Sequence, residues 1–357
     1  MKKRIGILTS GGDCPGLNAA IRGLAKSSYD LFNCEFVGIR HGYKGLIDGD
    51  YYEMKKSDFS GILTLGGTML GSKRTPFKEM RNIGEDGIDK VASMVKNYKK
   101  MNLDCLVTLG GNGTHKNANL LREEGLNVIG LPKTIDNDIY GTDFTFGFHS
   151  AIDIATDVID KIHTTASSHD RVMIVELMGN KAGWLTLYAG LAGGADIVLI
   201  PEIPYSIDSV YNALLERQKQ GKNFSIIAIA EGAKTIEEAQ MKKRELEQYR
   251  SEMQYHTVSY RLAEQINKKL GFDTRVTVPG HTQRGGAPSA LDRILATKFG
   301  AFAAKMIKDE NYGKTVSIVE NKLKATPLEE MAYMRKPVTR DCDEFKTALQ
   351  LGVSFGE

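Results

Sequence analysis

The chain has 357 residues, of which 41% are hydrophobic and 25% are charged, and its formal net charge is +3. This composition is typical of a globular protein with one large or two ordinary domains, and the small, dispersed positive charge argues against nucleic-acid binding. No apolar run reaches membrane-spanning length, and residues 5–8 are too short for the core of a signal peptide. We therefore expect a cytoplasmic protein with no membrane partner.

The first half of the chain alternates short apolar runs with helical patterns. Helices are expected at 19–31 and near 117–124, and strands at 4–9, 35–39, 104–108 and 128–131. Strands that are apolar almost throughout, with helices between them, are typical of a parallel sheet covered by helices on both faces.

The second half repeats this pattern. Its expected strands are 172–177, 197–200, 225–229, 275–278 and 315–319. The predicted fold class is therefore α/β, with two doubly wound Rossmann-like lobes, mainly parallel sheets and an active site in the cleft between them.

We expect one lobe to comprise residues 1–147 with about 283–333, and the other to comprise 148–282 with about 334–357. Residues 234–270 are rich in Glu, Lys, Gln and Arg and almost free of Gly, which predicts one or two exposed helices. A solvated surface insertion is favoured there over a partner-binding helix.

The loop Pro132-Lys133-Thr134-Ile135-Asp136-Asn137-Asp138 follows one of the apolar strands. Ligands of open α/β sheets bind at the carboxyl ends of the strands. Two neighbouring carboxylates can divide the work, one taking a proton while the other holds a metal or is held by a cation.

Glycine-rich loops after two other strands predict phosphate binding. They are Thr9-Ser10-Gly11-Gly12-Asp13 and Gly110-Gly111-Asn112-Gly113-Thr114, and neither is a Walker A or a dinucleotide fingerprint. Gly66-Gly67-Thr68 and Gly71-Ser72-Lys73-Arg74 add small residues and cations that can bridge phosphates.

Further cations and polar groups in the second half suit a phosphorylated, hydroxyl-bearing acceptor. They are Arg171, Glu231, Arg275, His281 and Arg284. The combination indicates phosphoryl transfer, with Asp136 as the base for the attacking hydroxyl.

Five of these motifs, in this order, resemble the bacterial-type 6-phosphofructokinase family. They are residues 9–13, 67–72, 110–114, 134–138 and Gly280-His281-Thr282-Gln283-Arg284-Gly285-Gly286. The resemblance extends from Arg4 to about Arg340.

The resemblance implies transfer of a phosphoryl group from ATP, with Mg²⁺, to the 1-hydroxyl of fructose 6-phosphate, a step of glycolysis. Asp136 matches the general base, and Thr134, Asp138 and Arg74 match its partners around the reacting phosphate. Positions that match nucleotide contacts are Gly12, Tyr43, Arg74, Thr75, Gly111, Asn112, Gly113 and Thr114. Positions that match substrate contacts are Thr134, Ile135, Asp136, Arg171, Met178, Gly179, Asn180, Glu231, Arg275, His281 and Arg284.

In the family, arginines at positions 171 and 275 serve the site of a neighbouring subunit. The resemblance therefore implies a homo-oligomer, usually a tetramer. It also assigns the phosphate donor to the lobe that contains the N-terminus and the sugar phosphate to the other lobe.

The chain departs from the family pattern at the predicted metal site and near the reacting phosphate. Asn112 stands where the family commonly has an Asp, and a neutral amide oxygen is a weaker ligand for a hard cation. Asp138 is therefore expected to balance more of the metal's charge than usual. Asn180 replaces an Arg, and we expect Lys133 to supply the missing charge.

Two residues bear on the donor. Gly113 resembles ATP-using members, whereas Lys133 resembles pyrophosphate users and some ATP users, so ATP is favoured and pyrophosphate stays an alternative. A catalytically impaired regulatory subunit is a further alternative, because Asn112 and Asn180 depart from the pattern.

Overall fold

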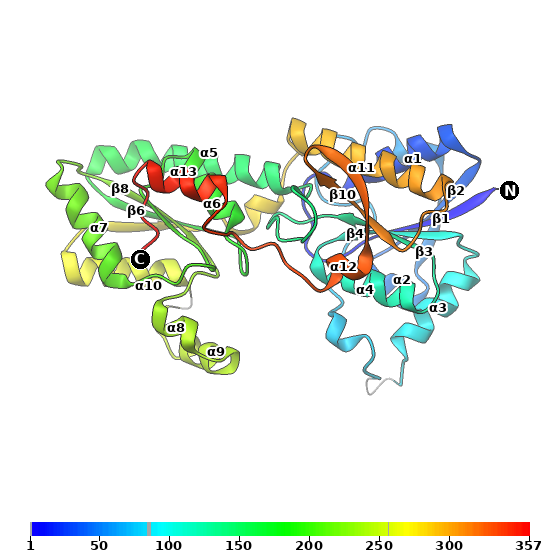
Figure 1. Cartoon of the computed structure of the whole chain (residues 1–357), viewed down its shortest axis with the longest axis horizontal. Coiled ribbons are helices and arrows are strands. Elements are labelled where there is room, and N and C mark those ends of the chain that lie inside the picture. The colour runs from blue at the N-terminus through cyan, green and yellow to red at the C-terminus, as the bar shows by residue number, and fades with distance from the viewer. Residues whose placement is uncertain (1, 84–86, 256) are drawn as a thin grey trace. The chain divides into compact units, whose positions relative to one another are not determined.

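The structure is a computed structural model that describes residues 2–83, 87–255 and 257–357. The chain divides into two compact units, one formed by Met1–Ser150 with Arg284–Lys336 and the other by Ala151–Gln283 with Pro337–Glu357. Each unit is built around one sheet with helices on both faces (Figure 1). The predicted α/β class with mainly parallel sheets is therefore confirmed.

The sheet of the first unit contains seven strands among the described residues, in the order β11-β10-β5-β4-β1-β2-β3. Its inner pairs are parallel, and the two outermost pairs, β2–β3 and β10–β11, are antiparallel. The bounds are β1 Lys3–Thr9, β2 Cys34–Ile39, β3 Tyr51–Met54, β4 Cys105–Gly110, β5 Val128–Pro132, β10 Lys314–Val319 and β11 Lys322–Pro327. Because the inner strands are parallel, their carboxyl ends share one edge.

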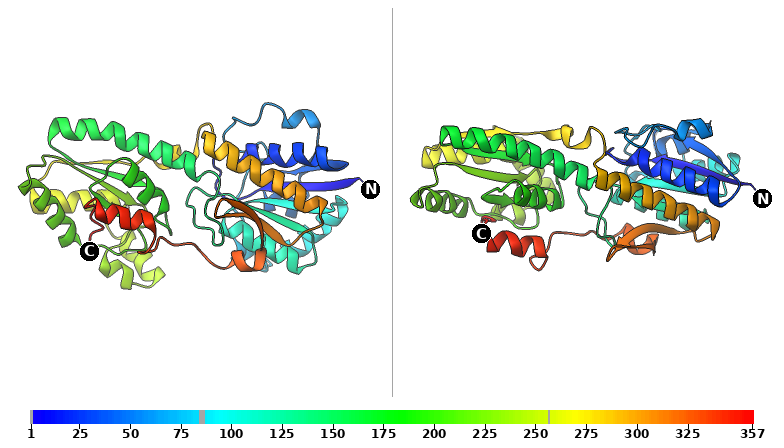
Figure 2. Two further views of the ribbon diagram at one scale, coloured as in Figure 1. Left: turned by 45° about the horizontal axis from the view of Figure 1, so that its top comes forward. Right: turned by 90° about the horizontal axis from the view of Figure 1, so that it is seen from above.

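Helices α1 and α11 cover one face of this sheet, and α2, α3, α4 and α12 cover the other (Figure 1). The bounds are α1 Leu17–Leu31, α2 Tyr43–Asp48, α3 Lys90–Lys100, α4 Asn112–Glu123, α11 Ala290–Lys308 and α12 Leu328–Ala332. Helices α1 and α11 lie side by side (Figure 2). A Cβ at Gly300 would lie 2.2 Å from the carbonyl oxygen of Ala20, so this close packing requires glycine.

In the described part of the second unit, four parallel strands form a sheet in the order β7-β8-β6-β9. Its strands are β6 Val172–Leu177, β7 Ile197–Leu199, β8 Ser225–Ala230 and β9 Thr274–Thr277. The surrounding helices are α5 Phe148–His169, α6 Trp184–Ala192, α7 Ile207–Lys219, α8 Ile236–Gln240, α9 Lys243–Ser251, α10 Val258–Leu270 and α13 Asp343–Gln350. Single 3-10 turns occupy Lys56–Phe59, Phe77–Glu79 and Gly280–Arg284.

The predicted strands are confirmed within two residues at either end. The prediction of one or two exposed helices at 234–270 is wrong for its last part. Helix α10 buries Val258, Leu262 and Ile266 in the core of the second unit, against strands that include β6. Its apolar residues recur only about once per turn among charged neighbours. This narrow stripe is enough to bury the helix, but it is too sparse to be recognised in the sequence.

Among the described residues, no helix is both long and apolar enough to cross a membrane.

Candidate active site

The loop after β5 presents its two carboxylates in different environments. Asn137 between them adopts φ 50°, a left-handed conformation that Asn tolerates. Its side chain accepts a hydrogen bond from the Thr145 N–H at 3.0 Å and donates to the Asp143 carbonyl at 3.2 Å. The turn leaves Asp136 half-buried and Asp138 8% exposed.

Two neighbours of Asp136 are fixed within the same loop. The Thr134 hydroxyl accepts a hydrogen bond from the Asp136 N–H at 3.1 Å, and the Thr134 carbonyl accepts one from the Thr145 hydroxyl at 2.7 Å. Ile135 is fully buried, so only its backbone is available to a ligand. The loop is therefore held rigidly around a partly accessible carboxylate.

Asp138 and Asn112 form one polar unit. The Asn112 amide donates to the Asp138 carboxylate at 2.7 Å and to the Asp138 carbonyl at 3.2 Å. Burial raises the pKa of Asp138, although Arg335 and the Asn112 amide oppose this. The Asn112 side-chain oxygen is buried and has no hydrogen-bond partner among the described residues. An orphaned oxygen beside a carboxylate fits a hard cation.

No group of three His, Cys, Asp or Glu side chains that could hold a metal is present in the part of the chain that the structure describes. A cation at Asn112 and Asp138 would therefore need further oxygen ligands from water or from the bound phosphates.

Two cations contact the loop after β1. The Lys133 ammonium donates a short hydrogen bond to the Gly12 carbonyl, and Arg284 donates to the Asp13 carbonyl at 3.2 Å. A Cβ at Gly12 would lie 2.8 Å from the Arg284 guanidinium, so glycine permits this contact. Burial lowers the pKa of Lys133. Arg284, expected among the sugar-phosphate contacts, thus lies against the predicted donor loop.

The loop after β4 is supported from beneath by Tyr43 and His115. The Tyr43 hydroxyl donates to the Thr114 carbonyl at 2.8 Å, and the Tyr43 side chain is fully buried. The His115 ring lies 3.1 Å from the Gly111 carbonyl through Nδ1 and 3.0 Å from the Thr315 hydroxyl through Nε2. Burial lowers the pKa of His115 to about 4, which keeps the ring neutral. The sequence assigned His115 no role, because a lone histidine carries no spacing signal.

A cavity of about 180 Å³ opens in the first unit near the predicted nucleotide contacts. Its lining residues are Lys44, Ile47, Lys73, Arg74, Thr75, Pro76, Glu79, Ile88 and Lys90. Arg74 and Thr75 were predicted, whereas Lys44 and Ile47 on α2 and Lys90 on α3 carry no sequence signal. The Thr75 hydroxyl is buried without a hydrogen-bond partner among the described residues, as expected for a group that awaits a ligand.

A second cavity, of about 100 Å³, gathers predicted substrate residues in the second unit. Its lining residues are Glu176, Leu177, Met178, Glu231, Val278, Gly280, His281 and Gln283. The turn that contains Glu231 packs on the loop of residues 178–180, because a Cβ at Gly232 would lie 2.1 Å from the Asn180 carbonyl oxygen. Glu176 was not predicted, since it lies inside an apolar strand.

Arg171 and Arg275 lie at one edge of the second unit's sheet, and the cavity residues Met178 and Glu231 lie at the opposite edge. Arg171 directly precedes β6 and Arg275 is the second residue of β9, whereas Met178 and Glu231 follow the carboxyl ends of β6 and β8. Both arginines pair with Asp273, Arg171 at 2.6 Å and Arg275 through a shorter contact. Within one chain the two arginines therefore do not meet Glu231 and His281.

Comparisons of sequence and structure agree with one another. The model of the phosphofructokinase family matches residues 4–307. The chain is 53% identical to an ATP-dependent 6-phosphofructokinase of Spirochaeta thermophila, over 99% of this chain and 98% of that protein. It is 45% identical to ATP-dependent 6-phosphofructokinase 3 of Bacteroides thetaiotaomicron, over 99% and 100% of the two chains.

The crystal structure of Pichia pastoris phosphofructokinase in the T-state matches with a TM-score of 0.81 and 33% identity. The match covers 93% of this chain and 35% of the Pichia chain, so this protein spans about a third of that structure's length. By sequence, by fold and by the loops at its strand ends, the chain belongs to the phosphofructokinase family.

Proposed function

We propose that this protein is an ATP-dependent 6-phosphofructokinase that converts fructose 6-phosphate into fructose 1,6-bisphosphate. The observation that carries the proposal is the loop Thr134–Asp138, which holds a half-buried carboxylate beside the Asn112–Asp138 unit and the glycine loops. Full-length relatives of that name support it.

Asp136 is the general base. It accepts the proton of the sugar 1-hydroxyl as that oxygen attacks the γ-phosphorus and the bond to the leaving diphosphate breaks. Thr134 holds Asp136 through the backbone contact at 3.1 Å. Arg74, exposed at the donor cavity, offsets negative charge as the phosphoryl group moves.

The cavity of the first unit that is lined by Arg74 and Thr75, called the donor cavity here, supports ATP over pyrophosphate as the donor. Its mixture of apolar and cationic side chains suits a nucleotide, which joins an apolar base to charged phosphates, whereas pyrophosphate has no apolar part. A Cβ at Gly113 would meet no atom within 4 Å, so the space beside it is open to the nucleotide's phosphates. Lys133, the residue that resembles pyrophosphate users, is buried against the Gly12 carbonyl and stabilises the loop.

Mg²⁺ fits the buried Asn112 side-chain oxygen and the Asp138 carboxylate. The bound cation would neutralise charge on the donor phosphates. Asn112 orients Asp138, and its amide oxygen would be a ligand that adds no negative charge.

Glu231, Met178 and His281 form the sugar-phosphate site, with Gly179 and Asn180 in the adjoining loop. The placement of Arg171 and Arg275 at the other sheet edge supports the proposal that they complete the site of a neighbouring subunit, in a cytoplasmic homotetramer.

The test supplies the purified protein with fructose 6-phosphate, Mg²⁺ and either ATP or pyrophosphate, and identifies the product by phosphorus NMR. We expect fructose 1,6-bisphosphate with ATP. Turnover with pyrophosphate alone would replace the assigned donor, and no turnover with either donor would favour the regulatory subunit.

A further inference from the structure

The charged segment after β8 forms a helical hairpin, residues 234–252, for which the proposed function provides no role. Of the residues in α8 and α9, only Glu238 is buried, and it is polar. A hydrophobic core therefore does not hold this hairpin in place, and its polar contacts must do so.

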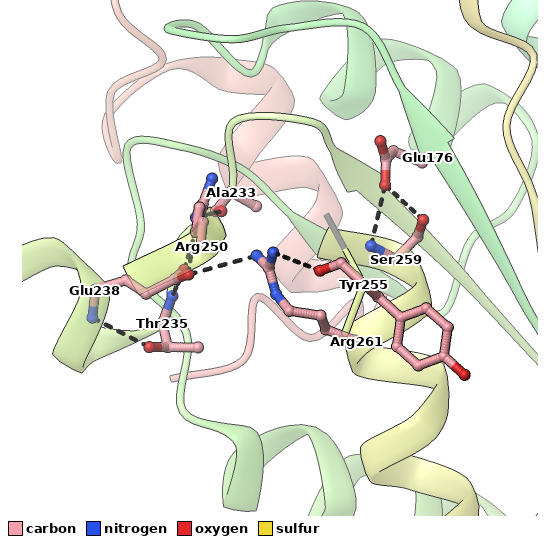
Figure 3. Close-up of polar contacts among 8 residues, drawn as sticks. All are labelled: Glu176, Ala233, Thr235, Glu238, Arg250, Tyr255, Ser259 and Arg261. Atoms are coloured by element: carbon pink, nitrogen blue, oxygen red, sulfur yellow. Dashed lines mark hydrogen bonds and ion pairs between the residues drawn. The ribbon is translucent and has the colours of Figure 1, made fainter. Parts of the chain in front are cut away.

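Three charged residues, Glu238, Arg250 and Arg261, make these contacts and are called the hairpin cluster here (Figure 3). Arg250 binds the Glu238 carboxylate in a bidentate manner, at 2.8 and 2.7 Å, and Arg261 approaches the same carboxylate at 3.4 Å. Burial alone would raise the pKa of Glu238, but the two arginines together lower it, so the carboxylate is ionised. Such bidentate, charge-assisted contacts define geometry strongly.

The hairpin cluster reaches the sugar-phosphate cavity through Ala233. The Arg250 guanidinium also donates to the Ala233 carbonyl at 2.9 Å (Figure 3). Ala233 closes a turn with Ala230 at 2.9 Å, and this turn contains Glu231, which lines the cavity. Gly232 in the same turn packs on the Asn180 backbone. A displacement of Ala233 would therefore move Glu231 directly.

A second anchor ties the helix that follows the hairpin to the wall of the same cavity. The Glu176 carboxylate accepts hydrogen bonds from the backbone N–H of Ser259, at 3.0 Å, and from its hydroxyl (Figure 3). Ser259 lies in the first turn of α10, where the N–H groups have no acceptor within the helix and a carboxylate can bind them. Glu176 lines the cavity together with Glu231. Two residues within the segment 234–270 therefore make these contacts, Arg250 with the Glu231 turn and Ser259 with Glu176 of the cavity.

We propose that the hairpin cluster is a positioning element, which fixes the turn of residues 231–233 and thereby aims Glu231 at the sugar phosphate. The inference rests on the proposed function, because it assigns the cavity to fructose 6-phosphate. It gives the charged hairpin a part in substrate affinity instead of the purely solvated role expected from its composition.

The test is steady-state kinetics of Arg250→Ala, which removes the contacts to Glu238 and Ala233. We expect KM for fructose 6-phosphate to rise about ten-fold, because the charge-assisted contacts that hold the turn are lost. KM for ATP is expected to stay within about two-fold, since the donor cavity shares no residue with the cluster. A merely structural role would lower the amount of active enzyme and leave KM for the sugar unchanged.

Arg250→Lys is the conservative variant and should raise that KM by only about three-fold, because one ammonium replaces the fork. If Arg250→Ala does not fold, the KM of Arg250→Lys for fructose 6-phosphate tests the inference in its place. Arg244→Ala, at an exposed position of the same helix, is the matched control and should match the wild type. An unchanged KM for fructose 6-phosphate in the folded Arg250 variants, with an active wild type, overturns the inference alone, whereas an inactive wild type overturns the proposed function.

Discussion

At the scale of single residues, the Asp-Asn-Asp spacing predicts a pair of carboxylates at a strand end, and the structure shows how they differ. The left-handed turn at Asn137 leaves Asp136 half-buried and Asp138 nearly enclosed. The spacing could not predict that Asn112 would bind Asp138, because that contact joins two loops 26 residues apart. His115 was missed for a similar reason, since its partners Gly111 and Thr315 become neighbours only in the folded sheet.

His115 gives a prediction on pH. Its pKa is about 4 in the folded protein and near 6.5 in the unfolded chain, so between these values the unfolded chain binds a proton that the folded protein excludes. Stability is therefore fully present above pH 6.5 and falls as the pH drops toward 4, by up to about 3 kcal/mol. In urea unfolding at pH values inside and above this window, His115→Gln should lose this part of the pH dependence. An unchanged pH dependence in the variant would show that His115 is already protonated or accessible when folded.

At the scale of elements, continuous apolar character predicted the parallel strands well. The edge strands β3 and β11 were not predicted, because they are short or partly exposed and lack such a run. Helix α10 was misjudged because charged residues surround its narrow apolar stripe. The charged segment 234–270 therefore has two parts: a hairpin, residues 234–252, that is held by polar contacts, and helix α10, which is held by the hydrophobic core.

Truncation of one α10 side chain tests this division. Leu262 is fully buried, so Leu262→Ala should lower the free energy of unfolding by about 2–5 kcal/mol, as cavity-forming substitutions do. The control is Tyr249→Ala on α9, where 42% of the side chain is exposed and the change should stay below about 0.5 kcal/mol. If denaturant unfolding shows that both substitutions lower the free energy of unfolding equally, α10 is not buried in the core.

At the scale of the whole molecule, the proposed function requires residues from more than one chain. Arg171 and Arg275 lie at the amino edge of the second unit's sheet, and Glu231 lies at its carboxyl edge. A sequence pattern does not indicate whether a residue acts in the site of its own chain or in that of a neighbouring subunit. The sharing of sites between subunits was therefore inferred from the family resemblance alone and stays a proposal.

Mixed oligomers test the sharing of sites. Asp136→Asn and Arg275→Ala each impair every site of their own oligomer. If Arg275 serves a neighbour, hybrids contain sites with both native residues, and random mixing should restore about a quarter of the wild-type activity. If each site uses one chain alone, mixing leaves the activity at the average of the two parents.

The proposed mechanism depends above all on Asp136, which takes the proton of the attacking sugar hydroxyl, and the kcat of Asp136→Asn with ATP and fructose 6-phosphate measures this role. If Asp136 is the general base, kcat falls by about 10²–10⁴-fold, while both KM values change little because the amide keeps the shape of the carboxylate. Asp160→Asn, at an exposed position of α5, should retain wild-type kcat. A kcat for Asp136→Asn close to that of the wild type would contradict the assignment.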